Sequence, residues 1–397
     1  METSTDTQNP PEAPQSSRKR KVWLLGLLLL VILAGLGTWA WYSLVGRWYE
    51  STDDAYVNGN VVEITPLVTG TVTSIGADDG DLVHAGQVLL QFDPSDSEVA
   101  LQSAQANLAR TVRQVRGLYS NVDSLKAQLD TRQAELRKAQ QDFNRRKVLA
   151  DSGAIAAEEL SHARDDLSVA QAAVNSARQQ LSTSTALVDD TEVASHPEVM
   201  AAAADLRKAY LDHARTTLVA PVTGYVAKRT VQLGQRLQPG TATMAVIPLD
   251  QVWIDANFKE TQLRQMRIGQ PVEISADLYG GAVTYTGTVD SLGAGTGSAF
   301  ALLPAQNATG NWIKIVQRVP VRIHINPEQL RDHPLRIGLS TVAEVDLHDQ
   351  SGPALAQQPP QQASYTTQVY DRQLGEADKL IAQLIRDNSA PGKTAQR

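Results

Sequence analysis

Paired carboxylates, histidines and one glycine-rich loop are the patterns in this sequence that could take part in acid–base, metal or phosphate chemistry. Asp53 and Asp54 stand together but are isolated, close to a long apolar segment, so we expect a structural role at the entry to a strand. The 7 histidines lack zinc-ligand spacing. No Lys-Ser/Thr pair follows the loop 293–297, which argues against a phosphate loop. We therefore expect no catalytic residue, metal or cofactor.

Composition narrows the chemistry further. Cysteine is absent, which excludes disulfides, thiolate metal sites, cysteine nucleophiles and a lipidated N-terminal cysteine. The net charge of −7 argues against a general nucleic-acid binder, which would carry a basic face.

Two heptad series in the middle of the chain predict helices. The first series repeats every seven residues, with companions three residues later: Leu101, Leu108, Val115, Val122, Leu129, Leu136 and Phe143. The second series comprises Leu160, Leu167, Val174, Leu181 and Val188. Asp151-Ser152-Gly153 separates them and supplies a turn. We predict an antiparallel coiled-coil hairpin over 96–214 whose tip carries Arg145, Leu149 and Ala156. A coiled coil that only dimerises is the alternative.

A repeated glycine pattern flanks this helical region. Gly70, Gly80 and Gly86 recur at identical spacing about 150 residues later as Gly224, Gly234 and Gly240. Each copy predicts short strands joined by glycine turns, which cannot bury an apolar face alone. The two copies should therefore pair into one β domain from which the hairpin projects.

An apolar run from Val22 to about Val45 predicts a transmembrane helix, since roughly 24 residues exceed the ~20 needed to span a bilayer. Four basic residues at 18–21 precede it, so the positive-inside rule places the N-terminus in the cytoplasm. A cleaved secretory signal is the alternative, although the run exceeds the usual length of a signal core.

Beyond Asp250 the pattern changes to alternation of apolar and polar residues. Strands are predicted at 251–258, 271–276, 287–292, 319–325 and 340–347, with one short helix at 259–266. Several short antiparallel strands around a small helix predict a β-barrel. The fold class is therefore α+β and elongated.

The glycine repeat resembles a lipoyl/biotinyl-carrier fold split in two, as in the membrane fusion proteins of the HlyD-like periplasmic adaptor family. The stretches Ser51–Asn60 and Phe300–Val321 are similar to EmrA-type multidrug adaptors. In the carrier proteins the halves meet at a turn bearing a modified lysine. Here the first half ends in Leu89–Asp96, which contains no lysine, so the resemblance does not extend to a lipoyl or biotinyl cofactor.

The resemblance also implies a role for the hairpin tip. Adaptors that dock onto TolC-like outer-membrane channels have a tip similar to Arg-x3-Leu-x6-Ser. Arg145 and Leu149 match this pattern, and Ala156 replaces the serine. Channel contact and an ordinary solvated turn both remain open for these residues.

The resemblance implies a non-enzymatic periplasmic adaptor of a tripartite multidrug efflux pump, anchored in the bacterial inner membrane by a single span. Its partners would be an inner-membrane major-facilitator drug exporter and a TolC-like outer-membrane channel, with the adaptor as a homo-oligomer, trimer or hexamer, and no nucleic acid. An adaptor of an ATP-driven type I secretion or export system is the alternative, and a carrier subunit a lesser one.

These readings divide the chain into consecutive segments. The membrane-proximal segments are a disordered cytoplasmic tail at residues 1–21, a transmembrane helix at 22–45 and a strand entering the barrel at 46–60. The first lipoyl-like half at 61–95, the hairpin at 96–214 and the second lipoyl-like half at 215–249 follow. The β-barrel at 250–350 and a disordered tail with a weak helix at 351–397 complete the division.

Overall fold

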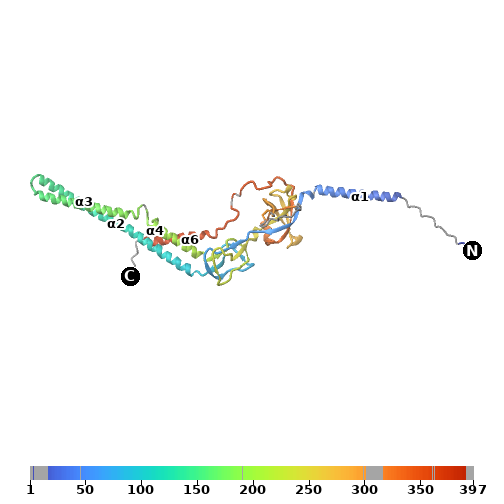
Figure 1. Ribbon diagram of the computed structural model, residues 1–397, viewed down its shortest axis with the longest axis horizontal. Coiled ribbons are helices and arrows are strands. Elements are labelled where there is room, and N and C mark those ends of the chain that lie inside the picture. Colours follow the sequence, from blue (N-terminus) through green and yellow to red (C-terminus); the bar gives the residue numbers. More distant parts are fainter. Residues whose placement is uncertain are drawn as a thin grey trace, which may run out of the picture. The chain divides into compact units, whose positions relative to one another are not determined.

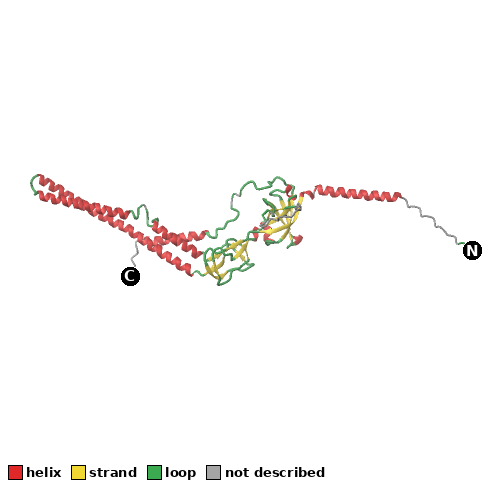
Figure 2. Ribbon diagram, viewed as in Figure 1, coloured by secondary structure: helices red, strands yellow, loops and turns green. Residues whose placement is uncertain are grey.

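The computed structural model describes residues 3, 17–44, 46–189, 191–297, 299–300, 316–359, 361 and 363–389. Most of the predicted N-terminal tail and of the stretch 300–321 lies outside the described residues, as does the end of the C-terminal tail. The chain forms two units. The barrel unit comprises Met1–Val61 and Pro248–Ser364, and the hairpin unit comprises Val62–Ile247 and Tyr365–Arg397. Figures 1 and 2 show the elements of each unit.

Helix α1 (Ser17–Leu44) begins the barrel unit. One helix within the described chain, Lys21–Trp48, is long and apolar enough to cross a membrane, and none of its most apolar window is buried. A sheath of exposed leucine and tryptophan side chains is unfavourable in water and favourable in lipid. The 3-10 turn η1 (Gly46–Trp48) joins it to the first strand.

Six strands form a closed barrel in the order β1-β10-β13-β12-β11-β14. Their bounds are β1 Tyr49–Asn58, β10 Trp253–Lys259, β11 Pro271–Ala276, β12 Thr284–Leu292, β13 Arg318–Ile325 and β14 Ser340–Asp346. Short helical turns lie between them: η2 Leu249–Gln251, η3 Gln262–Gln265, η4 Gly280–Ala282 and α5 Pro327–Asp332. Alternate residues of each strand point inward, where Phe258, Ile274 and Tyr285 are fully buried. The predicted barrel is confirmed.

The β domain of the hairpin unit is assembled from both glycine-containing halves, as the repeat predicts. One four-stranded sheet has the order β2-β9-β7-β4 and the other β6-β5-β3-β8. The first half supplies β2 Val62–Ile64, β3 Gly70–Ile75, β4 Leu82–Val83 and β5 Val88–Phe92. The second half supplies β6 Thr217–Val219, β7 Gly224–Ala227, β8 Arg236–Leu237 and β9 Met244–Ile247. Each sheet thus contains strands of both halves, and neither half could close its sheets alone.

Three helices form the hairpin: α2 (Ser95–Asp151, 57 residues), α3 (Ala157–Thr185) and α4 (Pro197–Ala214). The predicted seam is confirmed at its centre, because Leu108, Val115 and Val122 of α2 and Val174 of α3 are buried. The descending path is interrupted between Thr185 and Pro197, which separates α3 from α4. His196 caps α4 by accepting a hydrogen bond from the Glu198 amide.

The C-terminal segment differs from the expected disordered tail with a weak helix. Residues Asp371–Ser389 form helix α6, which packs against α2 and α4 (Figure 1). Ala377 and Ile381 of α6 are buried. The sequence shows an amphipathic pattern in this segment. It does not show that α2 and α4, which are distant in the chain, provide the surface that stabilises the helix.

Candidate functional site

The hairpin tip is a tight connection between α2 and α3. Gly153 adopts a left-handed backbone with φ +75°, which a side chain would strain. The Leu149 carbonyl accepts hydrogen bonds from the Ala154 amide at 2.8 Å and the Ser152 hydroxyl at 2.8 Å, so the last turn of α2 is capped. The tip therefore presents its side chains from a fixed backbone.

Two arginines at the tip share one carboxylate. Arg145 and Arg146 both form ion pairs with Asp142, the second at 2.8 Å. The Arg146 guanidinium also donates to the Glu159 carbonyl on α3 at 3.4 Å. Most of the Arg145 side chain is exposed, so its guanidinium keeps donors free for a further carboxylate or carbonyl.

Apolar side chains next to these arginines are exposed. Leu149 is 40% exposed and the neighbouring Val148 is 68% exposed. The resemblance to Arg-x3-Leu-x6-Ser tips identified Leu149 but not Val148, because that pattern leaves position 148 unspecified. The exposure of Val148 depends on the direction in which α2 ends. Together they form an apolar knob beside a cationic group, a combination suited to a protein partner.

Ala156 lies at the N-cap of α3, with an extended backbone and no side-chain cap. A serine at this position could accept a hydrogen bond from the first turn of α3, whereas alanine cannot. The structure brings Arg145, Leu149 and Ala156 to the same end of the hairpin, and its tip presents side chains without forming a catalytic arrangement.

The six repeat glycines lie where the two halves exchange hydrogen bonds. The Gly80 amide donates to the Val226 carbonyl at 2.9 Å, and the equivalent Gly234 amide donates to the Val72 carbonyl at 2.8 Å. In the same way, the Gly86 amide donates to the Ala220 carbonyl and the Gly240 amide donates to the Pro66 carbonyl. All four glycines have positive φ, and Gly70 and Gly224 begin the equivalent strands β3 and β7. The repeat thus records an internal two-fold relation.

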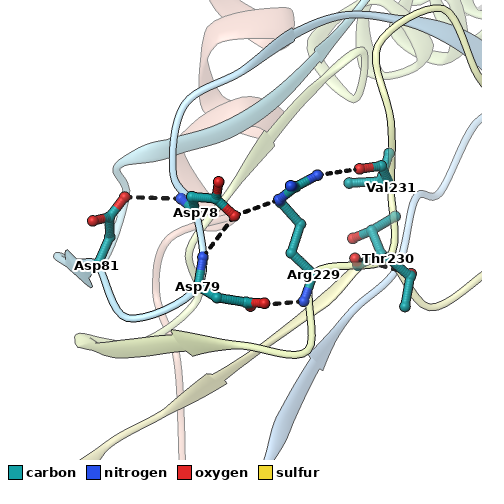
Figure 3. A network of polar contacts seen from close by, with 7 residues as sticks. Asp78, Asp79, Asp81, Arg229, Thr230 and Val231 are labelled. Atoms are coloured by element: carbon teal, nitrogen blue, oxygen red, sulfur yellow. Dashed lines mark hydrogen bonds and ion pairs between the residues drawn. The ribbon is translucent and has the colours of Figure 1, made fainter.

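An ion-pair network reinforces this pairing (Figure 3). Asp78 accepts a hydrogen bond from the Arg229 Nε at 2.6 Å, and Asp79 accepts one from the Arg229 amide at 2.8 Å. The Arg229 Nη1 donates to the Val231 carbonyl at 2.5 Å. The hydrogen bond from Arg229, followed by one from the Asp79 amide, lowers the pKa of Asp78. The network therefore joins a loop of the first half to a loop of the second.

Replacing Asp78 by asparagine should lower the thermal unfolding midpoint of the hairpin unit at neutral pH. A carboxyl group whose folded pKa is depressed stabilises the fold above its ordinary value of 3.8, and this contribution is lost as the pH falls through the folded pKa. The unfolding midpoints of the variant and the parent should therefore converge at pH values below the folded pKa of Asp78. Calorimetry of the detergent-solubilised chain across pH checks this, and an equal difference at every pH would contradict it.

Cysteines at Leu82 and Tyr225 should form a disulfide within one chain. These residues are direct partners in the β4–β7 pair and both are exposed. Since the chain contains no native cysteine, any crosslink arises from this pair. Non-reducing electrophoresis should show a faster-migrating monomer, with single-cysteine variants as controls. Crosslinked dimers alone would show that the halves pair between chains.

The structure gives Asp54 the expected structural role in the barrel. Asp54 forms an ion pair with Arg318 at 3.0 Å and accepts a hydrogen bond from Asn257 at 3.2 Å. Within the described part of the chain no group of three or more histidine, aspartate or glutamate residues could hold a metal ion. Where carrier proteins have their lysine turn, Asp93 accepts a hydrogen bond from the Ser95 amide and α2 begins.

Two family models match this chain. The model described as "EMRA, alpha-helical hairpin domain" matches residues 95–216, and the model described as "AAEA-like beta-barrel domain" matches residues 251–346. These ranges coincide with the helical hairpin and with five of the six barrel strands.

Similar proteins match over nearly the whole chain. The multidrug export protein EmrA of Escherichia coli K12 is 44% identical over 389 residues, covering 98% of this chain and 100% of that protein. The fatty acid resistance protein FarA of Neisseria gonorrhoeae is 48% identical over 347 residues, covering 87% of each. A solved structure of the periplasmic adaptor protein EmrA is 18% identical with a TM-score of 0.37, covering 76% of this chain and 99% of that one.

Proposed function

The chain belongs to the family of EmrA multidrug export proteins, which are periplasmic adaptors, and we propose that it bridges an inner-membrane drug exporter and an outer-membrane channel. The observation that carries this proposal is the capped hairpin tip. There α2 ends with an exposed apolar knob, formed by Val148 and Leu149, close to the exposed Arg145. A side-chain surface of this kind binds a protein and performs no chemical step.

The length of α2 suits a bridging role. With a rise of about 1.5 Å per residue, a helix of 57 residues extends for about 85 Å. Such a helix is costly to maintain in isolation, and α3 and α4 cover its apolar side along most of that length. The hairpin can therefore present its tip far from the β domain that carries it.

Anchoring would hold the other end of the adaptor at the inner membrane. Helix α1 begins with a basic cluster at 18–21, so the positive-inside rule favours a cytoplasmic N-terminus and a periplasmic location for the β-barrel and the hairpin unit. We expect an exporter of the major-facilitator class, driven by the proton gradient, to contact the adaptor beside this helix. An ATP-driven exporter is the second candidate.

Adaptor copies would form a ring, trimeric or hexameric, so that several tips engage the channel at once. Repeating a weak contact around a ring raises the overall affinity without a new type of contact. A modest apolar knob, such as the one formed by Val148 and Leu149, can then support a stable assembly.

A photo-crosslinking residue at Val148 tests the proposal. In intact cells it should crosslink the chain to an outer-membrane channel, because Val148 is the most exposed apolar side chain at the tip. The same residue at Val169, equally exposed but on α3, is the matched control and should give no channel product. Crosslinks from both positions would contradict the bridging role.

A fusion of alkaline phosphatase after Leu347 tests the periplasmic location of the barrel. The fusion should be active, and an inactive fusion would contradict the bridging role.

A further inference from the structure

Helix α6 presents one apolar face. Ala377 and Ile381 are 1% and 6% exposed, and Leu384 and Ile385 pack against the same cluster. These residues recur at three- and four-residue intervals, which places them on one side of the helix. The opposite side is exposed and includes charged residues, so α6 has a single apolar face that is stabilised by burial against other helices.

Helix α6 lies beside α2 and α4 (Figure 1). Its apolar face packs between these two helices, in what we call the α2–α4 groove. The buried apolar core of this groove comprises Leu108, Val112, Val115, Val199, Ala202, Ala203 and Leu206. Ile381 belongs to this buried cluster. Small residues on α4 allow α6 to approach closely, and the larger residues of α2 and α4 flank Ile381 in the same core. Part of the hairpin near the β domain is thus a three-helix bundle, whereas its distal part is a two-helix coiled coil.

Polar contacts fix the register of α6 near its start. Asp378 accepts hydrogen bonds from the Nε and Nη2 of Arg207 at 2.9 and 2.5 Å. The Tyr210 hydroxyl donates to Glu376 at 2.9 Å. Since Arg207 and Tyr210 lie on successive turns of α4, these two contacts align α6 with α4 along its length.

The other end of α6 is fixed to α2. The Arg113 guanidinium donates to the Asn388 side chain at 2.6 Å, and Arg116 donates to the Asn388 carbonyl at 3.3 Å. The last carbonyls of a helix have no partner within the helix and carry partial negative charge, so Arg116 satisfies one of them and both arginines place positive charge at that end. The groove therefore recognises the direction of α6 as well as its apolar face.

The return helix α4 depends on its neighbours because the chain is interrupted just before it. The described residues 186–189 and 191–196 lie between α3 and α4. The Tyr119 hydroxyl donates to the Thr191 carbonyl at 2.6 Å, and a ring nitrogen of His196 lies 3.0 Å from the Leu187 carbonyl. Without α6, the buried residues of α4 would be covered on one side only, by α2.

We propose that the α2–α4 groove is a helix-binding site whose ligand is the chain's own C-terminal helix, and that its occupancy holds α4 against α2. A 19-residue helix is marginal in water by itself, so α6 folds because the groove binds it. The segment before it connects Pro353, which is bonded to the barrel, to Thr367, which is bonded to the β domain, and so keeps α6 close to its site.

A labelled peptide of residues 371–389 tests the site directly. It should bind saturably to a chain ending at Tyr370 and at least about 10-fold more weakly to the full chain, whose groove is already filled by a tethered competitor. A peptide carrying Ile381→Asp should lose at least about 10-fold in affinity. A peptide carrying Leu374→Asp is the matched control, because Leu374 is 50% exposed, and should bind normally. Equal binding to both chains would overturn the proposal.

Hydrogen exchange in the full chain provides the second measurement, which does not depend on the folding of the shortened one. Ile381→Asp should raise exchange at 199–206 by at least about 10-fold and leave 163–177 on α3 unchanged. Leu374→Asp should change neither. Arg207→Asp should act in the same direction more weakly, and Asp378→Arg in the same chain should restore protection. Unchanged exchange at 199–206 in Ile381→Asp would overturn the proposal.

Cysteines at 207 and 378, joined by a short bismaleimide, decide which chain supplies the helix. With both cysteines in one chain, the product should be an internally linked monomer. With one cysteine on each of two differently tagged, co-expressed chains, no linked dimer should form. A linked dimer would show that neighbouring copies exchange α6 and would overturn the assignment of the site to the chain's own helix.

Discussion

A Leu149→Asp variant should accumulate to normal levels in the membrane and lose drug export. Leu149 is 40% exposed at the end of α2, so the aspartate costs little within the chain, whereas a charge placed in a desolvated contact costs about 2 kcal/mol at each interface. That corresponds to roughly 30-fold weaker docking for every tip. Drug susceptibility and copurification of the channel measure the loss.

Two controls separate docking from folding at the tip. Val169→Asp places the same charge on an exposed apolar position of α3 and should leave export intact. Leu149→Asn removes the apolar knob without a negative charge near the end of a helix, and should also reduce export. Normal export by both Leu149 variants would remove this residue from the mechanism, and failure of both to accumulate would show that it has a structural role.

Gly70→Val should destabilise the β domain strongly. A Cβ atom at Gly70 would lie 2.8 Å from the Cβ and Cγ of Phe92, and Phe92 is 2% exposed and cannot move aside. Forcing extra atoms into such a core costs about 1–3 kcal/mol. Since β3 pairs with β5 of its own half and β8 of the other, both halves should loosen together. Increased proteolysis within 62–92 and 217–247 measures this.

Gly117→Ala is the matched control for Gly70→Val. Gly117 lies in the middle of α2, nothing lies within 4 Å of a Cβ built there, and alanine favours a helix by about 0.5–1 kcal/mol. This variant should resist proteolysis at least as well as the parent. If Gly70→Val proved equally resistant, the close packing of Gly70 on Phe92 would not be essential to the pairing of the halves.

Local and periodic features of the fold could be predicted from the sequence. Heptads identify α2 and α3, alternation identifies the barrel strands, and the glycine repeat identifies two halves whose pairing the structure confirms. The glycine positions were visible because turns with positive φ exclude most other residues.

Features that depend on distant partners could not be predicted. The docking of α6 depends on a groove formed by residues from Leu108 to Leu206, to which the tail itself gives no clue. Val112 was missed because it lies outside the heptad series, although it is buried in the same cluster as Leu108 and Val115. At the tip, the sharing of Asp142 by two arginines and the exposure of Val148 depend on where α2 ends, and element boundaries are the least predictable feature of a sequence.

The position of β1 in the barrel sets a constraint on biogenesis. This strand is the first of the barrel to be synthesised, yet it pairs on one side with β10 and on the other with β14, which ends at Asp346. At 5–20 residues per second, roughly 15 to 60 seconds of synthesis separate β1 from its last partner. During that interval both of its edges are open to other strands, and Glu50, Asp53 and Asp54 supply the charge that discourages such pairing. The acidic residues of the first strand are thus expected to disfavour aggregation of an unfinished barrel.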